Sequence, residues 1–455
     1  MRSLPERTLA SGFHPRLARA AALLAILSCE PALAQAGPRP SAVDRAFADF
    51  FAAPDARQAA NEVDAVVASG VSFEDALGRL RRGRSYAADV PRGRTDDSGR
   101  IGGVAHRYAV IVPEAYDPAR AYPVRVQLHG GVGGPQRPGR GGDQAERLPG
   151  TRPEIWILPD SWSESMWWQE SQVENVAAIL DRVKRTYNVD ENRVYLTGIS
   201  DGGTGAYFFA FREPTAFASF LPLNGQMLVL SNPSTGVDGE IFPGNAVNRP
   251  FFGVNGGRDP LYPAAGVRPY VEHLEDIGVE IVWHVQAEAE HNTRWWTEER
   301  AAYEEFVAAH PRNPFRDQLS WETERTDRYD RVDWLVIEEL GHVEGEHQFA
   351  ENNVIGGAGM FGGRRPIFPH AAESGRVDLT RRGNVVTVTT EGVRAFTLLV
   401  SPSQFDLAKP VSVLVNGNVA FRGPVTPSVR TLLEWAARDN DRSALYAAEL
   451  RIEVR

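Results

Sequence analysis

Hydrophobic positions recur at different periods along the chain, and the period changes near residues 100 and 311. Between residues 41 and 86 the apolar side chains are spaced as on helices, with Pro54 as a break and Ser72 with Asp75 as a capping box. We expect residues 37–95 to form a small helical segment that packs on the domain following it. The stretch from Arg92 to Gly103, rich in Gly, Arg, Asp and Ser, is expected to be a linker.

From residue 100 to residue 312, short apolar runs alternate with amphipathic segments. The runs predict strands at His106–Val112, Val124–Leu128, Glu154–Leu158, Arg193–Leu196, Ser219–Leu223, Phe251–Val254 and Glu280–Val285. Apolar residues at helical spacing predict helices over residues 173–183 and 267–276. Buried strands that alternate with helices are typical of a doubly wound, mostly parallel sheet, so the predicted fold class is α/β.

After Pro311 the pattern changes to short strands with alternating side chains. Strands are predicted at Asp333–Ile337, Val385–Thr389, Phe396–Val400 and Ala448–Val454, and a helix over residues 428–438. Asn416-Gly417, between two apolar runs, is the signature of a two-residue hairpin turn. We expect residues 317–455 to form a separate β-rich accessory domain that is dispensable for the chemistry, because they contain no catalytic constellation.

Two further segments are expected to be irregular. Residues 230–248, with several prolines and glycines, are predicted to form a lid or a rim insertion, and residues 354–365 a mobile Gly-rich loop.

The first 36 residues have the composition of a signal peptide. Four arginines precede the apolar stretch of residues 20–27, and the small-residue motif Ala32-Leu33-Ala34 follows it. We therefore expect a secreted or periplasmic protein. Cys29, the only cysteine, lies in this leader, so it is either removed or, if residues 26–29 act as a lipobox, becomes a lipidated N-terminus.

The chain is acidic, with a formal net charge of −10 and no basic run. Such a surface argues against nucleic acid and anionic membranes as partners. No apolar segment is long enough to be a transmembrane span.

The most informative motif directly follows the apolar run that ends at Leu196. It reads Gly198-Ile199-Ser200-Asp201-Gly202 and precedes a helix-like stretch. A Gly-x-Ser-x-Gly between strand and helix predicts a tight turn that lifts the serine hydroxyl above the edge of a sheet. Ser200 is therefore the candidate nucleophile.

A serine nucleophile requires a base that takes its proton and a carboxylate that orients the base. When the serine occupies such a turn, both partners follow it in the chain, on loops after later strands. Asp259 lies in the loop after the strand at 251–254, and His291 follows the strand at 280–285. We assign Asp259 as the acid and His291 as the base, in preference to His284, which lies within the strand.

The oxyanion formed by attack of Ser200 needs preorganised N–H donors. The residue after the nucleophile, Asp201, should supply one of them. The second is expected from Gly131 or a neighbour, in the Gly-rich loop that follows the strand at 124–128.

These segments resemble a known family of enzymes. His129-Gly130-Gly131 and the stretch from Tyr187 to Gly203 look like the esterase branch of the α/β-hydrolase superfamily, over about residues 105–310. That branch includes enzymes similar to esterase D, feruloyl esterases, polyhydroxybutyrate depolymerases and phospholipase/carboxylesterases. The resemblance implies an α/β-hydrolase fold and the same roles for Ser200, Asp259 and His291. The N-terminal helical segment and the C-terminal β-rich domain lie outside the family's minimal pattern, so the class of substrate stays open.

Two pairs of tryptophans stand near the candidate site. Trp167 and Trp168, after the strand at 154–158, are candidate substrate-binding residues that stack on an acyl group, or they pack beneath the loop. For Trp295 and Trp296 we favour packing in the core.

No cofactor is expected. His342, Glu344, Glu346 and His347 are close in sequence, but we interpret them as a solvated polar loop and expect no metal site. The chain has neither a phosphate-binding loop nor a dinucleotide fingerprint.

The sequence thus predicts an exported serine hydrolase that cleaves small-molecule or polymer-linked carboxylic esters. Two alternatives are a serine peptidase of the prolyl-oligopeptidase type and an envelope- or carbohydrate-binding protein with a vestigial hydrolase domain.

Overall fold

The computed structural model describes residues 40–136, 148–342, 350–356, 363–370 and 372–454. The expected signal peptide and Cys29 lie outside the described residues. Every element described below lies in one compact unit, Ala42–Arg455.

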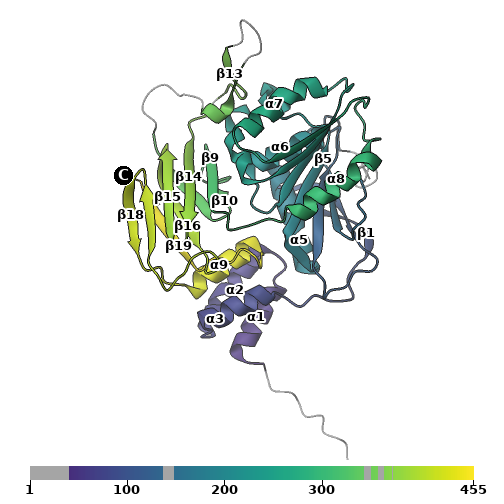
Figure 1. The fold of residues 1–455 in the computed structure, drawn as a ribbon. Coiled ribbons are helices and arrows are strands. Elements are labelled where there is room, and N and C mark those ends of the chain that lie inside the picture. Colours follow the sequence, from purple (N-terminus) through teal and green to yellow (C-terminus); the bar gives the residue numbers. More distant parts are fainter. Residues whose placement is uncertain (1–39, 137–147, 343–349, 357–362, 371, 455) are drawn as a thin grey trace, which may run out of the picture. The chain divides into compact units, whose positions relative to one another are not determined.

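An eight-stranded sheet forms the centre of the α/β region (Figure 1). Its strands are β1 Gly93–Ile101, β2 Val104–Val112, β3 Tyr122–Leu128, β4 Ile155–Pro159, β5 Val189–Ile199, β6 Ser219–Leu223, β7 Phe251–Gly256 and β8 Ile281–Gln286. They are ordered β1-β2-β4-β3-β5-β6-β7-β8, with antiparallel pairing only among β1, β2 and β4. The predicted α/β class with a mostly parallel sheet is confirmed.

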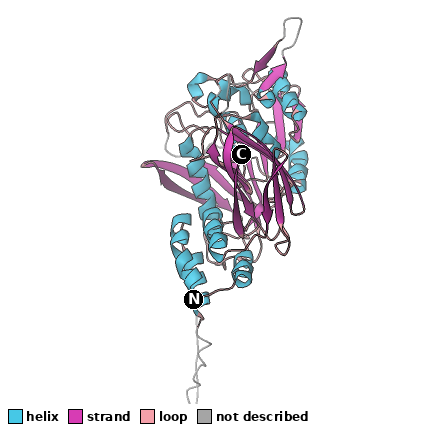
Figure 2. Ribbon diagram, turned by 90° about the vertical axis from the view of Figure 1, so that its left-hand side faces the viewer, coloured by secondary structure: helices cyan, strands magenta, loops and turns pink. Residues whose placement is uncertain are grey.

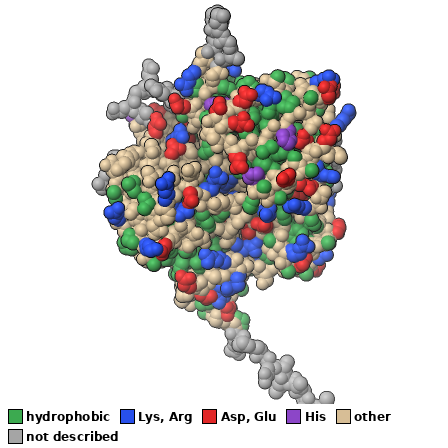
Figure 3. All heavy atoms as spheres, viewed as in Figure 1, with side chains coloured by type: hydrophobic (Ala, Val, Ile, Leu, Met, Phe, Trp, Pro, Cys, Tyr) green, Lys and Arg blue, Asp and Glu red, His purple; other side chains and the backbone are tan. Residues whose placement is uncertain are grey.

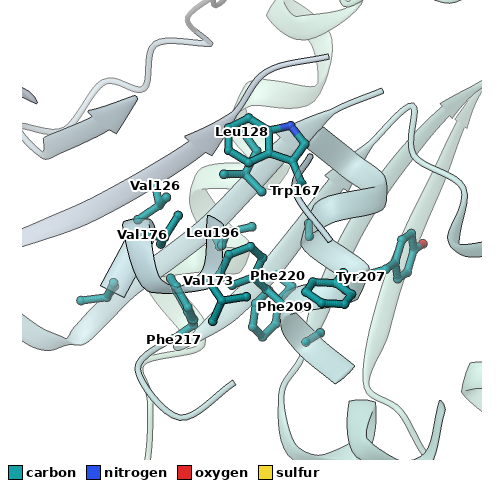
Figure 4. Packing of buried hydrophobic residues seen from close by; sticks show 14 of the residues in the cluster. Val126, Leu128, Trp167, Val173, Val176, Leu196, Tyr207, Phe209, Phe217 and Phe220 are labelled. Atoms are coloured by element: carbon teal, nitrogen blue, oxygen red, sulfur yellow. The ribbon is translucent and has the colours of Figure 1, made fainter. Parts of the chain in front are cut away.

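Helices and sheet bury a continuous apolar core. The helices of this region are α5 Glu170–Thr186, α6 Asp201–Arg212, α7 Ala264–Asp276 and α8 Trp296–Ala309. Figure 4 shows Leu196 of β5 and Phe220 of β6 among aromatic side chains of α6, such as Phe209. Because α6 is buried all round, its apolar side chains hold the turn that precedes it in one position.

The predicted linker at 92–103 is wrong, because these residues form the edge strand β1. Its residues pair antiparallel with β2 through a turn at Gly102 and Gly103, both of which have positive φ. Most of the strand is exposed, so it needs no apolar alternation, and its polar composition resembles that of a loop.

The N-terminal helices are α1 Ala42–Ala52, α2 Ala56–Ala68 and α3 Phe73–Arg82. Ser72 caps α3 through the Asp75 N–H, as the capping-box pattern predicts. We expected their apolar faces to pack on the domain that follows, but they do not do so chiefly. They share a core with α9 Val429–Asp439, near the other end of the chain, where Val66 and Leu433 are both buried.

The C-terminal β region contains two larger sheets, and their buried residues form one core. Figure 2 shows strands of this region in magenta around the marked C-terminus. One has the order β10-β11-β16-β19 and the other β18-β17-β15-β14-β9. The strands are β9 Gln318–Thr323, β10 Arg331–Val332, β11 Leu335–Leu340, β14 Gly375–Arg382, β15 Val385–Glu391, β16 Val393–Val400, β17 Val411–Val415, β18 Asn418–Gly423 and β19 Ala448–Glu453. The predicted hairpin is confirmed, with Asn416 and Gly417 at positive φ between β17 and β18. The irregular loop predicted at residues 354–365 is wrong at both ends, where β12 Val354–Gly356 pairs with β13 Arg364–Pro366. Residues 357–362 lie outside the described residues.

The segment predicted as a lid instead joins the two regions. Residues 227–248 form four short 3₁₀ helices, Met227–Ser231, Pro233–Thr235, Asp238–Glu240 and Pro243–Asn248, with Leu230, Ile241 and Ala246 buried. The Asn245 amide donates to the Glu322 carbonyl and accepts from the Glu322 N–H, both at 2.9 Å, so it extends the backbone pairing of β9.

Three buried arginine–carboxylate pairs fix the same contact, which we call the arginine interface. Arg212 holds Glu324 at 2.5 and 2.6 Å, Arg249 holds Asp333, and Arg312 holds Asp441 at 2.5 Å. The three arginine side chains are at most 2% exposed. Each arginine belongs to the α/β region or its connecting segment, and each carboxylate to the part that follows.

Candidate active site

Ser200 occupies a sharp turn between β5 and α6. Its φ is 58° and its ψ −119°, a conformation that non-glycine residues rarely adopt and that is retained mainly at functional sites. The glycines on either side are required by close approach, because a Cβ at Gly198 would lie 1.9 Å from the Gly202 carbonyl oxygen and one at Gly202 2.1 Å from that of Leu128. The Gly-x-Ser-x-Gly motif thus encodes a turn that only these glycines fit.

The structure brings Ser200, His291 and Asp259 into one hydrogen-bonded chain. The His291 Nε2 lies 2.8 Å from the Ser200 Oγ, and the Asp259 Oδ2 lies 2.6 Å from the His291 Nδ1. The loops after β5, β7 and β8 supply the three groups, so strands that are far apart in sequence deliver them to one edge of the sheet.

The three hydrogen-bonded side chains differ in how far they are buried. The Asp259 side chain is fully buried, whereas the His291 side chain is 19% exposed and Ser200 is partly exposed. The other carboxylate oxygen of Asp259 accepts from the N–H groups of Leu261 and Tyr262, at 2.8 and 2.9 Å. A buried carboxylate with three hydrogen bonds is fixed in position and can orient the imidazole.

The loop that follows β3 lies directly against the serine. A Cβ at Gly130 would come within 2.8 Å of the Ser200 Cβ, and Gly131 has a φ of 70°. The N–H of Val132 donates to the Asp201 carboxylate at 3.0 Å, which ties this loop to the first turn of α6. The N–H of Asp201 is the first of the helix and has no partner within it. The two predicted oxyanion donors, Gly131 and Asp201, therefore belong to segments in contact with Ser200.

The chain has an α/β-hydrolase fold. This fold is recognised by the strand order and by the sharp turn after β5. The candidate acid Asp259 and base His291 also follow Ser200 in the chain in the order that this fold has.

The comparisons with known proteins add little to this geometry. No family model and no curated protein matches the chain. A thermostable esterase of known structure is 23% identical, over 48% of this chain and 63% of its own, with a TM-score of 0.38. The butyrate-bound Est2 esterase of Thermogutta terrifontis is 14% identical over 48% and 94%, with a TM-score of 0.40. The acylaminoacyl peptidase of Pyrococcus horikoshii is 16% identical over 48% and 41%, with a TM-score of 0.38.

The matched part is thus less than two thirds of the thermostable esterase and of the peptidase. With identities of 23% or less and TM-scores of 0.40 or less, these likenesses carry no argument about the reaction.

The expectation that Trp167 and Trp168 stack on substrate needs correction. Both side chains are buried, and Trp167 belongs to the apolar core (Figure 4). Its indole N–H donates to the His129 carbonyl at 2.8 Å, so this side chain stabilises the loop just before Gly130. From sequence alone, packing and stacking were equally open, because burial depends on how α5 and α6 close over this loop. Trp295 and Trp296 are buried, as expected.

The rival base His284 and two further histidines have other hydrogen-bond partners than Ser200. The His284 Nδ1 is 2.6 Å from the Glu299 carboxylate on α8, and His273 bonds the Asn352 carbonyl. The His129 ring accepts from the Ser161 N–H at 3.1 Å and is buried, which makes it structural.

Two contributors to the site were not recognised in the sequence. For Asp201, only the backbone N–H was assigned a role, but its carboxylate also accepts a hydrogen bond from the Val132 N–H and so holds the loop. Tyr262 places its ring edge-on to His291, with centroids 5.5 Å apart, and burial together with the Asp201 and Asp259 carboxylates raises its pKa to about 12. The Asp259-Pro260 turn was the only available signal for Tyr262, since the distance to His291 depends on the fold.

Metal and membrane features can be judged only for the described part of the chain. There, no cluster of three His, Cys, Asp or Glu side chains is placed to hold a metal ion. Glu344, Glu346 and His347 lie outside it, and His342 is exposed. Within the same residues, no helix has the length and apolar content needed to cross a membrane.

Proposed function

We propose that the protein is an exported serine hydrolase that cleaves carboxylic esters through an acyl-enzyme. The observation that supports this most is the chain of hydrogen bonds from the Ser200 hydroxyl through His291 to the buried Asp259. An isolated serine hydroxyl is a weak nucleophile, and this arrangement gives it a base that is already in contact and oriented.

In the acylation step, the Ser200 Oγ attacks the ester carbonyl carbon while its proton passes to the His291 Nε2. The developing oxyanion is held by the N–H groups of Gly131 and Asp201. The tetrahedral intermediate collapses, the bond to the alcohol oxygen breaks, and that oxygen takes the proton from His291. Asp259 remains ionised and stabilises the transient imidazolium.

In the deacylation step, water replaces the alcohol. His291 removes a proton from water, the resulting hydroxide attacks the acyl carbon, and the Ser200 oxygen leaves with that proton as the carboxylic acid is released. The reaction needs no cofactor. The proposed substrate is a small-molecule or polymer-linked ester, and the leader of residues 1–36 supports export to the periplasm or beyond.

The test is covalent labelling with a fluorophosphonate, followed by a survey of turnover. Wild-type protein should be labelled at one site, and Ser200→Ala should not be labelled while its circular dichroism spectrum is unchanged. Ser163→Ala, a change of a partly buried serine outside the hydrogen-bonded chain, is the matched control and should be labelled normally.

Labelling of Ser200→Ala at the wild-type rate would refute the nucleophile. In the survey, p-nitrophenyl acyl esters should be turned over faster than peptide amides. The reverse preference would favour the peptidase, and a wild-type protein inert to the probe would favour a vestigial domain.

A further inference from the structure

A cavity of about 740 Å³ lies between the N-terminal helices and the last turn of α5. Among the described residues that line it are five arginines and one carboxylate: Arg79, Arg82, Arg84, Arg182, Arg185 and Asp44. Figure 3 shows Lys and Arg side chains in blue low on the molecule, near the helices α1–α3 of Figure 1. Three of these arginines also pair with carboxylates: Arg79 with Asp44 and Asp75, Arg182 with Asp97, and Arg185 with Asp181. The positive charge that stays available comes chiefly from Arg82 and Arg84.

One guanidinium in this cavity has unused hydrogen-bonding capacity. The Arg185 side chain is only 7% exposed. Its Nε bonds Asp181 at 2.8 Å and its Nη1 bonds the Ala53 carbonyl at 2.9 Å, whereas its Nη2 is buried without a partner among the described residues. A buried N–H group without a partner is unfavourable, and a bound acceptor would satisfy it.

The neighbouring arginines differ in how far their charge is compensated. Arg79 is paired with Asp44 and Asp75. Among the described residues, Arg84 bonds only the neutral amide oxygen of Asn440, and burial together with repulsion by Arg185 lowers its pKa. Arg82, at the end of α3, is exposed, and no described residue forms a hydrogen bond or an ion pair with it.

We propose that this cavity binds a small organic anion, whose phosphate or carboxylate group pairs with Arg82, Arg84 and Arg185. Guanidinium groups that converge on a site match the geometry of both anions. Phe51 and Pro54 also line the cavity and offer apolar surface to the remainder of the ligand.

The site is distinct from the one around Ser200. The strand β5 starts three residues after α5 ends, and its last residue, Ile199, precedes the serine. Eleven residues at about 3.3 Å each separate the two ends of this strand by roughly 35 Å. A small ligand cannot reach both sites, so it would act by fastening α3 to α5 rather than as the substrate.

The experiment is calorimetric titration of the full-length protein with phenyl phosphate, benzoate, inorganic phosphate and neutral benzyl alcohol, at constant ionic strength. We expect phenyl phosphate or benzoate to bind more tightly than inorganic phosphate, and benzyl alcohol not to bind. The stronger of the two aromatic ligands identifies whether phosphate or carboxylate is preferred.

Two neighbouring arginines provide the matched variants. Arg82→Ala removes a side chain that lines the cavity, whereas Arg81→Ala removes one that bonds Ser403 and does not line it. Arg82→Ala should weaken binding about tenfold, the effect of one charge-assisted hydrogen bond, and Arg81→Ala less than about twofold.

Both variants should keep the circular dichroism spectrum and the thermal unfolding transition of the wild type, which shows that they are folded. Equal weakening by the two changes, or no binding of any anion to the wild type at millimolar concentration, would overturn the proposal.

Discussion

The active site and the arginine interface are both built from charged side chains, but they use them in opposite ways. At the active site the Asp259 carboxylate is buried, whereas His291 and Ser200, which follow it in the hydrogen-bonded chain, are both partly exposed. At the arginine interface each buried cation is matched by a carboxylate, and neither partner is accessible. At the active site the hydroxyl proton of Ser200 can therefore pass to His291. At the arginine interface every charge is compensated by its partner.

The difference teaches where a single substitution should affect activity and where it should affect stability. Removing a group from an open hydrogen-bonded chain stops proton transfer but buries no new charge. Removing one partner of a closed pair leaves the other charged and buried, at a cost of about 3–5 kcal/mol. The following predictions separate these effects, from the largest to the smallest.

The largest effect is expected from the base of the active site. His291→Ala should lower kcat by roughly 10⁴-fold or more, because members of such a triad act as a unit. His284→Ala is the matched control, since this histidine pairs with Glu299 and not with the serine, and its kcat should change by no more than a few-fold. Steady-state kinetics with a p-nitrophenyl ester measures both. A greater loss in His284→Ala, without unfolding, would mean that the base was wrongly assigned.

A substitution at the arginine interface should produce the opposite result. Asp333→Asn leaves Arg249 buried beside a neutral amide and should lower the free energy of unfolding by about 3 kcal/mol or more. Asparagine tolerates the positive φ of this position, so strain should not add to the loss. Urea denaturation measures the change, and the kcat of the folded variant should stay within about twofold of the wild type. A large loss of kcat at unchanged stability would show that the arginine interface affects catalysis and would contradict this prediction.

Asp201 should show an intermediate effect, because its carboxylate positions the loop beside the serine. Asp201→Ala removes the acceptor for the Val132 N–H and should lower kcat by about 10- to 100-fold with little change in KM. Asp201→Asn keeps an oxygen acceptor and should recover most of this loss. Equal kcat values for the two variants would show that the hydrogen bond does not position the loop.

The smallest effect concerns pH and the C-terminal β region. Burial raises the pKa of Glu322 to about 6, and one of its carboxylate oxygens has no partner among the described residues. Between the unfolded and folded pKa values the folded state binds the extra proton, so stability falls as pH rises through this window. Glu322→Gln should remove this fall, by roughly 1–2 kcal/mol between about pH 4 and pH 7, in denaturation curves at several pH values. An unchanged slope would show that Glu322 does not titrate in this range.

The sequence predicted best those features that are encoded locally. The apolar runs of β6 and β7 begin at the predicted residues, because strands buried on both faces need continuous apolar sequence. The turn at Ser200 was predictable because its glycines are required by the backbone itself. The assignment of Asp259 and His291 followed from their places after strands, and the structure brings both to the serine.

Features that depend on partners distant in sequence were missed. The strand β1 is an exception, because its partner β2 directly follows it in the chain, and it was missed because it is exposed and polar. The burial of Trp167 depends on helices that close over it. The same is true of Arg212 and Arg249, whose partners lie more than eighty residues later. That residues 317–455 are dispensable for the chemistry stays a prediction, but these pairs connect them to the α/β region. A chain ending near residue 313 would lose the carboxylate partners of both arginines and expose the surface on which they lie, so we expect it to be less stable than the full-length chain.

The core shared by the N-terminal helices and α9 has a consequence for how the chain folds. Arg84 and Asn440, which are hydrogen-bonded across this contact, are 356 residues apart in sequence. Closing so long a loop is slow, and α1–α3 cannot bury their apolar faces until the last residues have been synthesised. The beginning of the chain should therefore remain exposed throughout synthesis, accessible to chaperones and proteases, and should become protected only in the final step of folding.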